Sequence, residues 1–410
     1  MCNYKYICKL HPIKTKIMRM LKNKIKLTFS ILLIVTVIGC NTKDKNKEST
    51  KNTQKAPSQN VLSAVIDSIN SEINNGDYGL IDRFMVIQNN ELLADYKYDQ
   101  DYKTIVQKYD TTNHQYNFNN TDWHPYYKKS ELHTLQSVTK SITSILLGIA
   151  LDLNEDYNVS NKAMPLLNGY DADFQDKRKQ NISIEDLLTM RSGLQWNEET
   201  DHNDHTNDCF LLEASDNWIE YVLSKPMDTM PGTKFVYNGG GTVLLGKIIR
   251  TITGKRIDKW AEEKLFEPLG ITDYYWKETP DGEIDTEGGL YLKAEDLVKI
   301  GSLFLNKGKW DGKQIVSENW VATSTSPLLK NVKPHWKSVT GYGYQWWVPE
   351  YTDNGKTNIY SANGYGGQYL MITPEHNLII VFNGWNINAE PEKSTYRVLQ
   401  DRIIPALKHK

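Results

Sequence analysis

The chain has 410 residues, 39% of them hydrophobic, with 11 Trp and 24 Tyr. This is enough apolar material for one large domain or two closely packed ones, and it excludes a disordered chain. Eight of the Lys and Arg residues lie in residues 1–40, which hold no Asp or Glu, so the net charge of −2 leaves −10 on the rest. A body that acidic gives no support to nucleic-acid binding, and we expect no nucleic-acid partner.

The basic start leads into an apolar stretch, Phe29–Ile38, which is too short for a comfortable transmembrane helix and fits the central region of a signal peptide. It ends at Val37-Ile38-Gly39-Cys40, which resembles the bacterial lipobox, where a Cys thiol receives lipid. We expect residues 1–40 to be a lipoprotein signal peptide. The protein would then be anchored through Cys40 in the bacterial cell envelope, in the outer membrane or on the periplasmic face. The alternatives are ordinary cleavage of a secreted protein and an uncleaved anchor.

The start of translation stays open among Met1, Met18 and Met20, because "MRMLKNKIK" is a complete basic leader by itself. Residues 41–60 have no apolar residue beyond one Ala and predict a flexible tether to a folded domain at 61–410. With Cys2 and Cys8 in the leader and Cys40 acylated, only Cys209 remains in that domain. An intrachain disulfide is then impossible, and Cys209 is expected to be a small buried hydrophobic residue.

Hydrophobic periodicity predicts strands at both ends of this domain and helices in its middle. An amphipathic helix begins at Val61, and the apolar runs 84–87 and 91–98 around Asn89-Asn90 predict a β-hairpin. Residues 102–130 predict an irregular segment. Further helices are predicted at 135–151, 183–190, 217–224, 242–253, 257–266, 294–305 and 393–407, and further strands at 341–348, 358–364, 368–373 and 377–382. The pattern predicts an α+β fold in which one antiparallel sheet, built from both termini and flanked by terminal helices, faces a helical lobe at about 145–285 across a cleft.

Ser137 and Lys140 stand one turn apart at the start of an otherwise apolar helical run. The first turn of a helix favours a developing anion, and a buried Lys can have its pKa lowered enough to accept a proton. This arrangement is typical of nucleophilic acyl transfer by a Ser that an amine activates. On this motif alone, the better interpretation is that Ser137 caps the helix and Lys140 extends toward solvent.

Several ordered segments around this motif resemble the serine β-lactamase and penicillin-binding-protein superfamily, in the class C β-lactamase-related branch of esterases and amide hydrolases. They are "HTLQSVTKSITSILLGIA", "ISIEDLLTMRSGL", "PGTKFVYNGGGTVLLGKII", "LFEPLGITDYYW", "GGLYLKAEDLVKIG" and "SANGYGGQYLMITPE". The resemblance extends from about Val61 to Ile403 and implies a β-lactamase/transpeptidase-like fold.

The resemblance assigns a role to each matching residue. It implies Ser137 as nucleophile, Lys140 as its general base, and Tyr237 in the proton network, where it can protonate the leaving group. It also implies an oxyanion hole made by the backbone N–H groups of Ser137 and Tyr365. Gly364 is expected to be glycine because the substrate backbone approaches the strand edge there.

Two positions depart from the pattern of the family. Where β-lactamases have a substrate-holding Asn two residues after the motif tyrosine, this chain has Gly239, with Asn238 one place early. Where the third motif usually begins with a Lys or His that attracts a substrate carboxylate, this chain has Ala362, followed by Asn363 and Gly364. Both changes weaken the case for penicillins or D-Ala-D-Ala substrates and leave the acyl-transfer residues intact.

Further residues have both a possible functional role and a purely structural interpretation. His202, His205 and Asp208 have spacings that a metal could use, but a solvated loop near the cleft is the better interpretation, so no metal is expected. His133 is expected to be a packed histidine. Trp346 and Trp347 are expected to divide between the core and the cleft wall by strand alternation.

The sequence thus predicts a serine hydrolase that forms an acyl-enzyme on Ser137 and needs no cofactor. Its expected substrates are small-molecule esters, then amides or peptides, then β-lactams. The alternatives are a true β-lactamase or D-Ala-D-Ala carboxypeptidase, and a non-catalytic protein that binds cell-wall peptides or a partner.

Replacing Cys40 by Ser should remove the lipid-modified form and release the protein from membrane fractions, because the acyl anchor would have no thiol to attach to. Labelled palmitate followed through fractionation measures this effect. Continued incorporation of palmitate into the Ser variant would exclude the lipobox interpretation.

Overall fold

This computed structural model describes residues 57–107, 117–167, 169–170, 176–200, 204–332, 340–349, 358–387 and 389–408. The chain divides into two compact units, Met1–Gln54 and Lys55–Lys410, and the described residues all belong to the second. The predicted leader, Cys40 and most of the predicted tether lie outside them. Within the described ranges, no helix is both long and apolar enough to cross a membrane.

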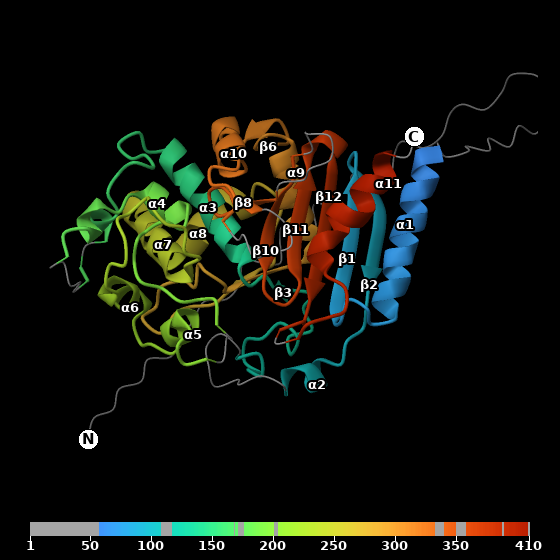
Figure 1. The fold of residues 1–410 in the computed structure, drawn as a ribbon, viewed down its shortest axis with the longest axis horizontal. Helices are drawn as coiled ribbons and strands as arrows, with labels where there is room; N and C mark the ends of the chain where they lie inside the picture. Colours follow the sequence, from blue (N-terminus) through green and yellow to red (C-terminus); the bar gives the residue numbers. More distant parts are fainter. Residues whose placement is uncertain are drawn as a thin grey trace, which may run out of the picture. The chain divides into compact units, whose positions relative to one another are not determined.

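The centre of the fold is a seven-stranded antiparallel sheet with strand order β2-β1-β12-β11-β10-β9-β8 (Figure 1). Strand β12, near the C-terminus, pairs with β1, with Phe84 opposite Phe382 and Val86 opposite Ile380. The expectation of one antiparallel sheet built from both ends of the chain is confirmed. The strands are β1 (Ile81–Gln88), β2 (Glu91–Lys97), β8 (Thr340–Tyr342), β9 (Trp347–Pro349), β10 (Tyr360–Gly364), β11 (Gln368–Thr373) and β12 (Leu378–Gly384).

The predicted hairpins form for the expected local reason. Asn89 and Asn90 join β1 to β2 with φ of 53° and 62°, the left-handed conformation that tight two-residue hairpins require and that Asn tolerates. The predicted single strand at 341–348 is wrong. It is two short strands, β8 and β9, with a turn between them in which Gln345 has φ of 63°.

Terminal helices cover one face of the sheet. Helix α1 (Pro57–Asn74) packs against α11 (Ile404–Lys408), and the apolar side chains of both join those of β1 and β12 in one cluster. Helix α1 begins at Pro57, so the last residues of the predicted tether are helical. The predicted helix at 393–407 is divided into a 3-10 turn (Thr395–Arg397), a π-helical turn (Leu399–Ile403) and α11. Pro405 has no N–H to continue a regular α-helical ladder through this segment.

Helix α3 (Val138–Asp152) lies between the sheet and the helical lobe (Figure 1), and its residues from Val138 to Ala150 are buried. It contacts β10 on one side and α7 on the other. The helices that follow along the chain are α4 (Ile184–Leu188), α5 (Asp208–Glu213), α6 (Trp218–Ser224), α7 (Gly239–Thr253), α8 (Ile257–Ala261), the π-helical turn Glu262–Phe266, α9 (Ala294–Leu305) and α10 (Glu318–Ser324). The α5 helix was not predicted. The described part of the segment at 102–130 includes a short helix, α2 (Tyr102–Val106).

A second, three-stranded sheet joins distant parts of the chain beside α3. Its strands are β3 (His133–Thr134), β5 (Leu290–Leu292) and β4 (Tyr275–Trp276), in that order. The ladder between β3 and β5 continues with a hydrogen bond from the Leu135 N–H to the Leu290 carbonyl at 2.9 Å. The residues just before Leu290 therefore lie next to the start of α3.

Gly148 tests the close packing of α3. A Cβ on Gly148 would lie 2.5 Å from ring atoms of Trp320, so Gly148→Ala should destabilise the protein by about 1–3 kcal/mol despite the better helix propensity of Ala. Urea unfolding measures the change in free energy. Gly241→Ala in α7 is the matched control, since its Cβ would meet neighbours no closer than 3.7 Å. Equal stability of the two variants would contradict the packing argument.

Candidate active site

Ser137 stands at the junction of β3 and α3 with its hydroxyl free for chemistry. It occupies the N-cap position of α3, yet its side chain makes no capping hydrogen bond. The preceding residue, Gln136, has φ of 47°, an unfavourable conformation for a residue with a Cβ. Such a turn holds the following side chain in a fixed direction. The alternative that Ser137 simply caps the helix does not describe this geometry.

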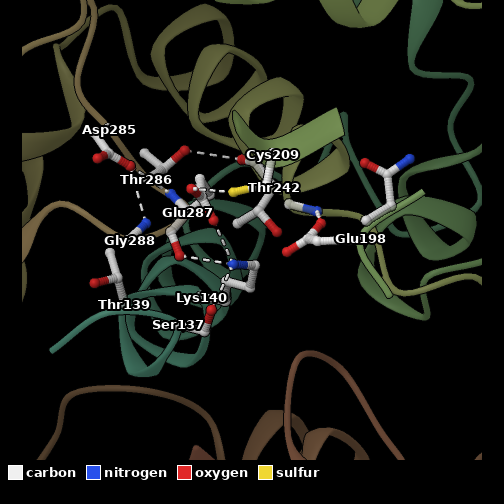
Figure 2. Close-up of polar contacts among 12 residues, drawn as sticks. Ser137, Thr139, Lys140, Glu198, Cys209, Thr242, Asp285, Thr286, Glu287 and Gly288 are labelled. Carbon is white, nitrogen blue, oxygen red and sulfur yellow. Dashed lines mark hydrogen bonds and ion pairs between the residues drawn. The ribbon is translucent and has the colours of Figure 1, made fainter. Parts of the chain in front are cut away.

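Lys140 lies one turn further along α3 and reaches back to Ser137 (Figure 2). Its side chain is 1% exposed, so it does not extend toward solvent. The Nζ atom lies 2.9 Å from Ser137 Oγ, 2.8 Å from the Glu287 carbonyl oxygen and 2.5 Å from Glu287 Oε2. All three bonds hold the amine against the hydroxyl that it is expected to activate.

The charge on Lys140 differs from the sequence-based expectation. Burial by itself would lower the pKa of Lys140, but the Glu287 carboxylate at 2.5 Å outweighs burial, and the pKa is raised well above its usual range. The lysine is therefore an ammonium group in the resting protein. The expectation of a lowered pKa was wrong because no local pattern indicates that Glu287, 147 residues away, is the partner of Lys140.

Tyr237 faces the same pair from the loop before α7. Its ring stacks on Trp347 with centroids 5.6 Å apart, and Lys140 Nζ lies 5.4 Å from its ring centroid. Burial raises the pKa of Tyr237, against the opposing effects of the Lys140 charge and a hydrogen bond with Ser137. The phenol thus keeps its proton at neutral pH and can act as a donor.

The end of β10 forms the other wall of the site. Gly364 and Tyr365 line the pocket beside Ser137. A Cβ on Gly364 would lie 2.3 Å from the carbonyl oxygen of Leu135, so any side chain here would push β10 away from the turn that carries the serine. The glycine therefore permits close approach of protein backbone, in addition to the approach of substrate that the sequence suggested.

The pocket in front of Ser137 has a volume of about 400 Å³, in the range of small-molecule sites. Acidic and aromatic side chains dominate its wall. Its lining residues are Ser137, Glu198, Glu199, Thr200, Tyr237, Trp347, Asn363, Gly364, Tyr365, Tyr369, Ser394 and Tyr396. None of these described lining residues is Lys or Arg, so the pocket offers a carboxylate-bearing ligand no surface cation.

Three residues expected to contact substrate do not line this pocket. Ala362 is fully buried in the core. Asn238 caps α7, accepting a hydrogen bond from the Gly241 N–H at 2.9 Å. The Gly239 N–H donates to Glu198 Oε2 at 2.8 Å. Asn238 and Gly239 thus have local roles at the start of α7, and Ala362 faces the core from β10, which the motif pattern alone does not reveal.

The other candidates behave largely as packed side chains. His133 is buried, 3.2 Å from Asp82 and against the Trp385 ring, as expected. Trp346 is buried in the core while Trp347 lines the pocket, which confirms the predicted division. Cys209 is buried, as expected.

The loop residues weighed as possible metal ligands, where they are described, make other contacts. Asp208 accepts from the Asn197 N–H and the Tyr221 hydroxyl, His205 packs on Phe210, and His202 lies outside the described ranges.

One described group does bring potential metal-binding atoms within 4.8 Å of one another, namely Glu198, Cys209 and Glu287. The Lys140 ammonium is already bonded to Glu287 at this place, so the cation that these acidic groups face is the lysine. The arrangement therefore gives no reason to add a metal.

Comparison with known proteins places the chain in a family. The sequence model of the family described as Beta-lactamase matches residues 86–401. The chain is 23% identical to the N-acetylmuramyl-L-alanine amidase of Bacillus subtilis (strain 168), over 49% of this chain and 55% of that protein. It is 24% identical to the 6-aminohexanoate-dimer hydrolase of Paenarthrobacter ureafaciens, over 66% of this chain and 70% of that protein. The chain thus spans little more than half the length of the amidase.

Solved structures agree on the fold. A family VIII carboxylesterase superposes with a TM-score of 0.61 at 14% identity, covering 86% of this chain and 97% of the esterase. The penicillin-binding protein homologue from Pyrococcus abyssi superposes with a TM-score of 0.57 at 17% identity, covering 81% and 74%. The predicted β-lactamase/transpeptidase-like fold is confirmed.

Proposed function

The chain belongs to the β-lactamase family, and on this basis we propose that it is a serine hydrolase that forms an acyl-enzyme on Ser137 from a small neutral ester or amide. The observation that carries this proposal is the 2.9 Å contact between Lys140 Nζ and the Ser137 hydroxyl, which makes no capping hydrogen bond to α3. The Lys140 nitrogen is placed to take up the hydroxyl proton as Oγ attacks an acyl carbon, provided that the ammonium group gives up one of its own protons.

The surrounding groups supply the remaining chemistry. The backbone N–H groups of Ser137 and Tyr365 would stabilise the oxyanion of the tetrahedral intermediate, a contribution of about 2.7–4 kcal/mol for each donor. The protonated phenol of Tyr237 would donate to the leaving group. Water then attacks the acyl ester, and the same groups return the proton to Ser137 Oγ.

The pocket wall favours neutral acyl groups. Because Ala362 is buried and no described lining residue is Lys or Arg, a substrate carboxylate would lack a charge-assisted hydrogen bond and would face Glu198 and Glu199. Loss of such a bond costs about 1.5–3 kcal/mol. Esters therefore rank first, then amides or peptides, then β-lactams.

The place of action is part of the proposal. A lipid anchor at Cys40 would put this site at the bacterial envelope, and the names of relatives include an N-acetylmuramyl-L-alanine amidase. A role as a D-Ala-D-Ala carboxypeptidase or as a non-catalytic cell-wall binder is the competing proposal. The assembled Ser137, Lys140 and Tyr237 argue against a pure binder, which has no use for a free nucleophile beside an amine.

Ser137→Ala should abolish turnover of p-nitrophenyl acetate and labelling by a fluorophosphonate, while the melting temperature stays nearly unchanged, because the hydroxyl caps nothing. Mass spectrometry of the labelled protein should locate the adduct on Ser137. Retained turnover, or an adduct elsewhere, would assign the nucleophile to another residue.

Tyr237→Phe should lower kcat by roughly 10²–10⁴-fold with little change in KM, because it keeps the stacking on Trp347 and removes only the proton donor. Steady-state kinetics on the same ester give both constants. A loss below about threefold would assign Tyr237 a packing role.

Nitrocefin should be turned over slowly or not at all, while p-nitrophenyl acetate or butyrate is turned over readily, because the β-lactam carries a carboxylate. The comparison is kcat/KM for the two substrates on the unmodified protein. Ala362→Lys would not rescue a site in which this position is buried, so it serves as a control for the argument from the pocket wall. Efficient nitrocefin hydrolysis with negligible esterase activity would reverse the ranking.

A further inference from the structure

The charge of the Lys140 ammonium group is balanced by the carboxylate of Glu287, which lies outside the sequence motifs assigned to the site. Glu287 is 3% exposed and binds Lys140 Nζ twice, through its carbonyl oxygen at 2.8 Å and its Oε2 at 2.5 Å. Figure 2 shows Glu287 and Ser137 bonded to the same nitrogen atom. The three groups form a continuous hydrogen-bonded row from Ser137 Oγ through Lys140 Nζ to Glu287 Oε2.

The backbone around Glu287 is fixed from both neighbouring helices. The Thr143 hydroxyl on α3 donates to the Thr286 carbonyl at 2.9 Å, and the Thr286 hydroxyl donates to the Thr242 carbonyl on α7 at 2.9 Å. Asp285 Oδ1 accepts from the N–H groups of Glu287 and Gly288 at 3.2 and 2.9 Å. The carboxylate therefore has little freedom to leave the lysine.

Gly239 makes the room for this carboxylate. A Cβ at position 239 would lie 2.8 Å from Glu287 Oε2 and 3.4 Å from Glu198 Oε2. The larger Asn that the β-lactamase motif has at this position would collide with Glu287. The buried Glu287 carboxylate therefore requires glycine in place of the motif Asn at position 239.

Resting on the proposed function, we propose that Glu287 is a positioning residue that accepts, through Lys140, the proton that Ser137 loses on attack. The Oγ–H bond of Ser137 breaks as Oγ bonds to the acyl carbon, and that proton moves to Nζ. One of the Nζ protons moves to Glu287 Oε2 at the same time. Lys140 stays an ammonium group, Glu287 becomes a carboxylic acid, and the negative charge passes to the substrate oxyanion.

The same row works in reverse when the leaving group departs. Glu287 returns its proton to Lys140, and an Nζ proton passes to the leaving group by way of the Tyr237 hydroxyl. In deacylation, the Nζ proton passes instead to Ser137 Oγ as the acyl carbon leaves it. Proton number is conserved within the site, so no external acid or base enters the step.

The charges facing this row suit a carboxylate that takes up a proton and gives it back. Burial tends to raise the pKa of Glu287, but the Lys140 charge and hydrogen bond lower it overall. Burial and the Glu287 charge raise the pKa of Glu213 on α5 well above its usual range, which makes Glu213 a neutral hydrogen-bond partner of Glu287. Cys209 Sγ lies 3.4 Å from Glu287 Oε1, and burial raises the pKa of this thiol, so it stays protonated.

Three further titratable groups face the cluster. Burial and the Glu287 charge raise the pKa of Asp285 to about 6, and burial lowers the pKa of Lys277. Burial also raises the pKa of Glu198, on the pocket side. Of these groups, Asp285 titrates within the range of the test below and needs its own control.

The pH dependence of kcat/KM distinguishes this relay from a lysine that acts alone. In the relay the active form is the Lys140 ammonium with the Glu287 carboxylate. Activity is lost only as Glu287 takes up a proton from solvent, at a pKa below its usual value. The wild-type profile should therefore be flat from about pH 9 down to about pH 5. A lysine that must first lose its proton to solvent would instead make kcat/KM rise with pH up to and beyond pH 9, because its pKa is raised.

Glu287→Gln keeps the hydrogen bond to Lys140 and removes the proton acceptor. The acid limb of the profile, where kcat/KM falls with decreasing pH, should then reflect protonation of Lys140 and move to higher pH. We expect at least a tenfold loss of kcat/KM at pH 6 and recovery toward wild type at pH 9–10. If Glu287 were only a counter-ion, its loss would lower the lysine pKa, and the limb would move to lower pH with a gain at pH 6.

Asp285→Asn is the matched control. The Asn Oδ1 can still accept the N–H bonds of Glu287 and Gly288 that Asp285 accepts, while the carboxyl group is removed, so the acid limb should move far less than in Glu287→Gln. A limb that moves with Asp285→Asn and not with Glu287→Gln overturns the proposal. So does a wild-type limb above pH 8, which needs no variant to fold. Wild-type protein with no ester turnover and no fluorophosphonate adduct on Ser137 would instead overturn the proposed function itself.

Discussion

A cation buried at the start of the most enclosed helix is the constraint around which this structure is arranged. Lys140 is 1% exposed and is the one charged side chain among the buried residues of its helix. An isolated ammonium group in such a place would be strongly disfavoured. The chain meets this constraint with the carboxylate and carbonyl of Glu287, which requires the β3–β5 ladder to bring residue 290 beside residue 135 and requires α7 to carry glycine at its first position.

This explains why the two departures from the β-lactamase motifs have different meanings. Gly239 is a steric requirement, because the space of a side chain there is taken by Glu287. Ala362 is a core residue, because its side chain on β10 packs into the core while Asn363, the next residue, lines the pocket. The first change alters how the lysine is held, and the second alters what the pocket can attract.

Sequence reasoning predicted the parts of the fold that local chemistry determines. The hairpin at Asn89-Asn90, the antiparallel pairing of both ends and the Ser137–Lys140 pair follow from turn residues, alternation and helical spacing. The division of 340–349 into two strands, the short α5 helix and the broken C-terminal helix were missed. There, tertiary contacts and the placement of Pro405 override the periodicity. Glu287 was missed for a different reason, because a contact across 147 residues leaves no local pattern in one sequence.

The buried acidic groups around Lys140 are poorly explained as a device for stability. Taking a carboxylate and an ammonium group out of water costs several kcal/mol for each ion, and apolar side chains of similar size commonly serve a core at least as well. Away from this site, the α3 core consists largely of Leu, Ile and Val packed against α7 and β10. Glu213, Glu287 and Cys209 are gathered on the one side of α3 where the free serine hydroxyl lies. A fold that gathers these ionisable residues behind its nucleophile uses them to control the proton on Lys140 more than to hold the helices together.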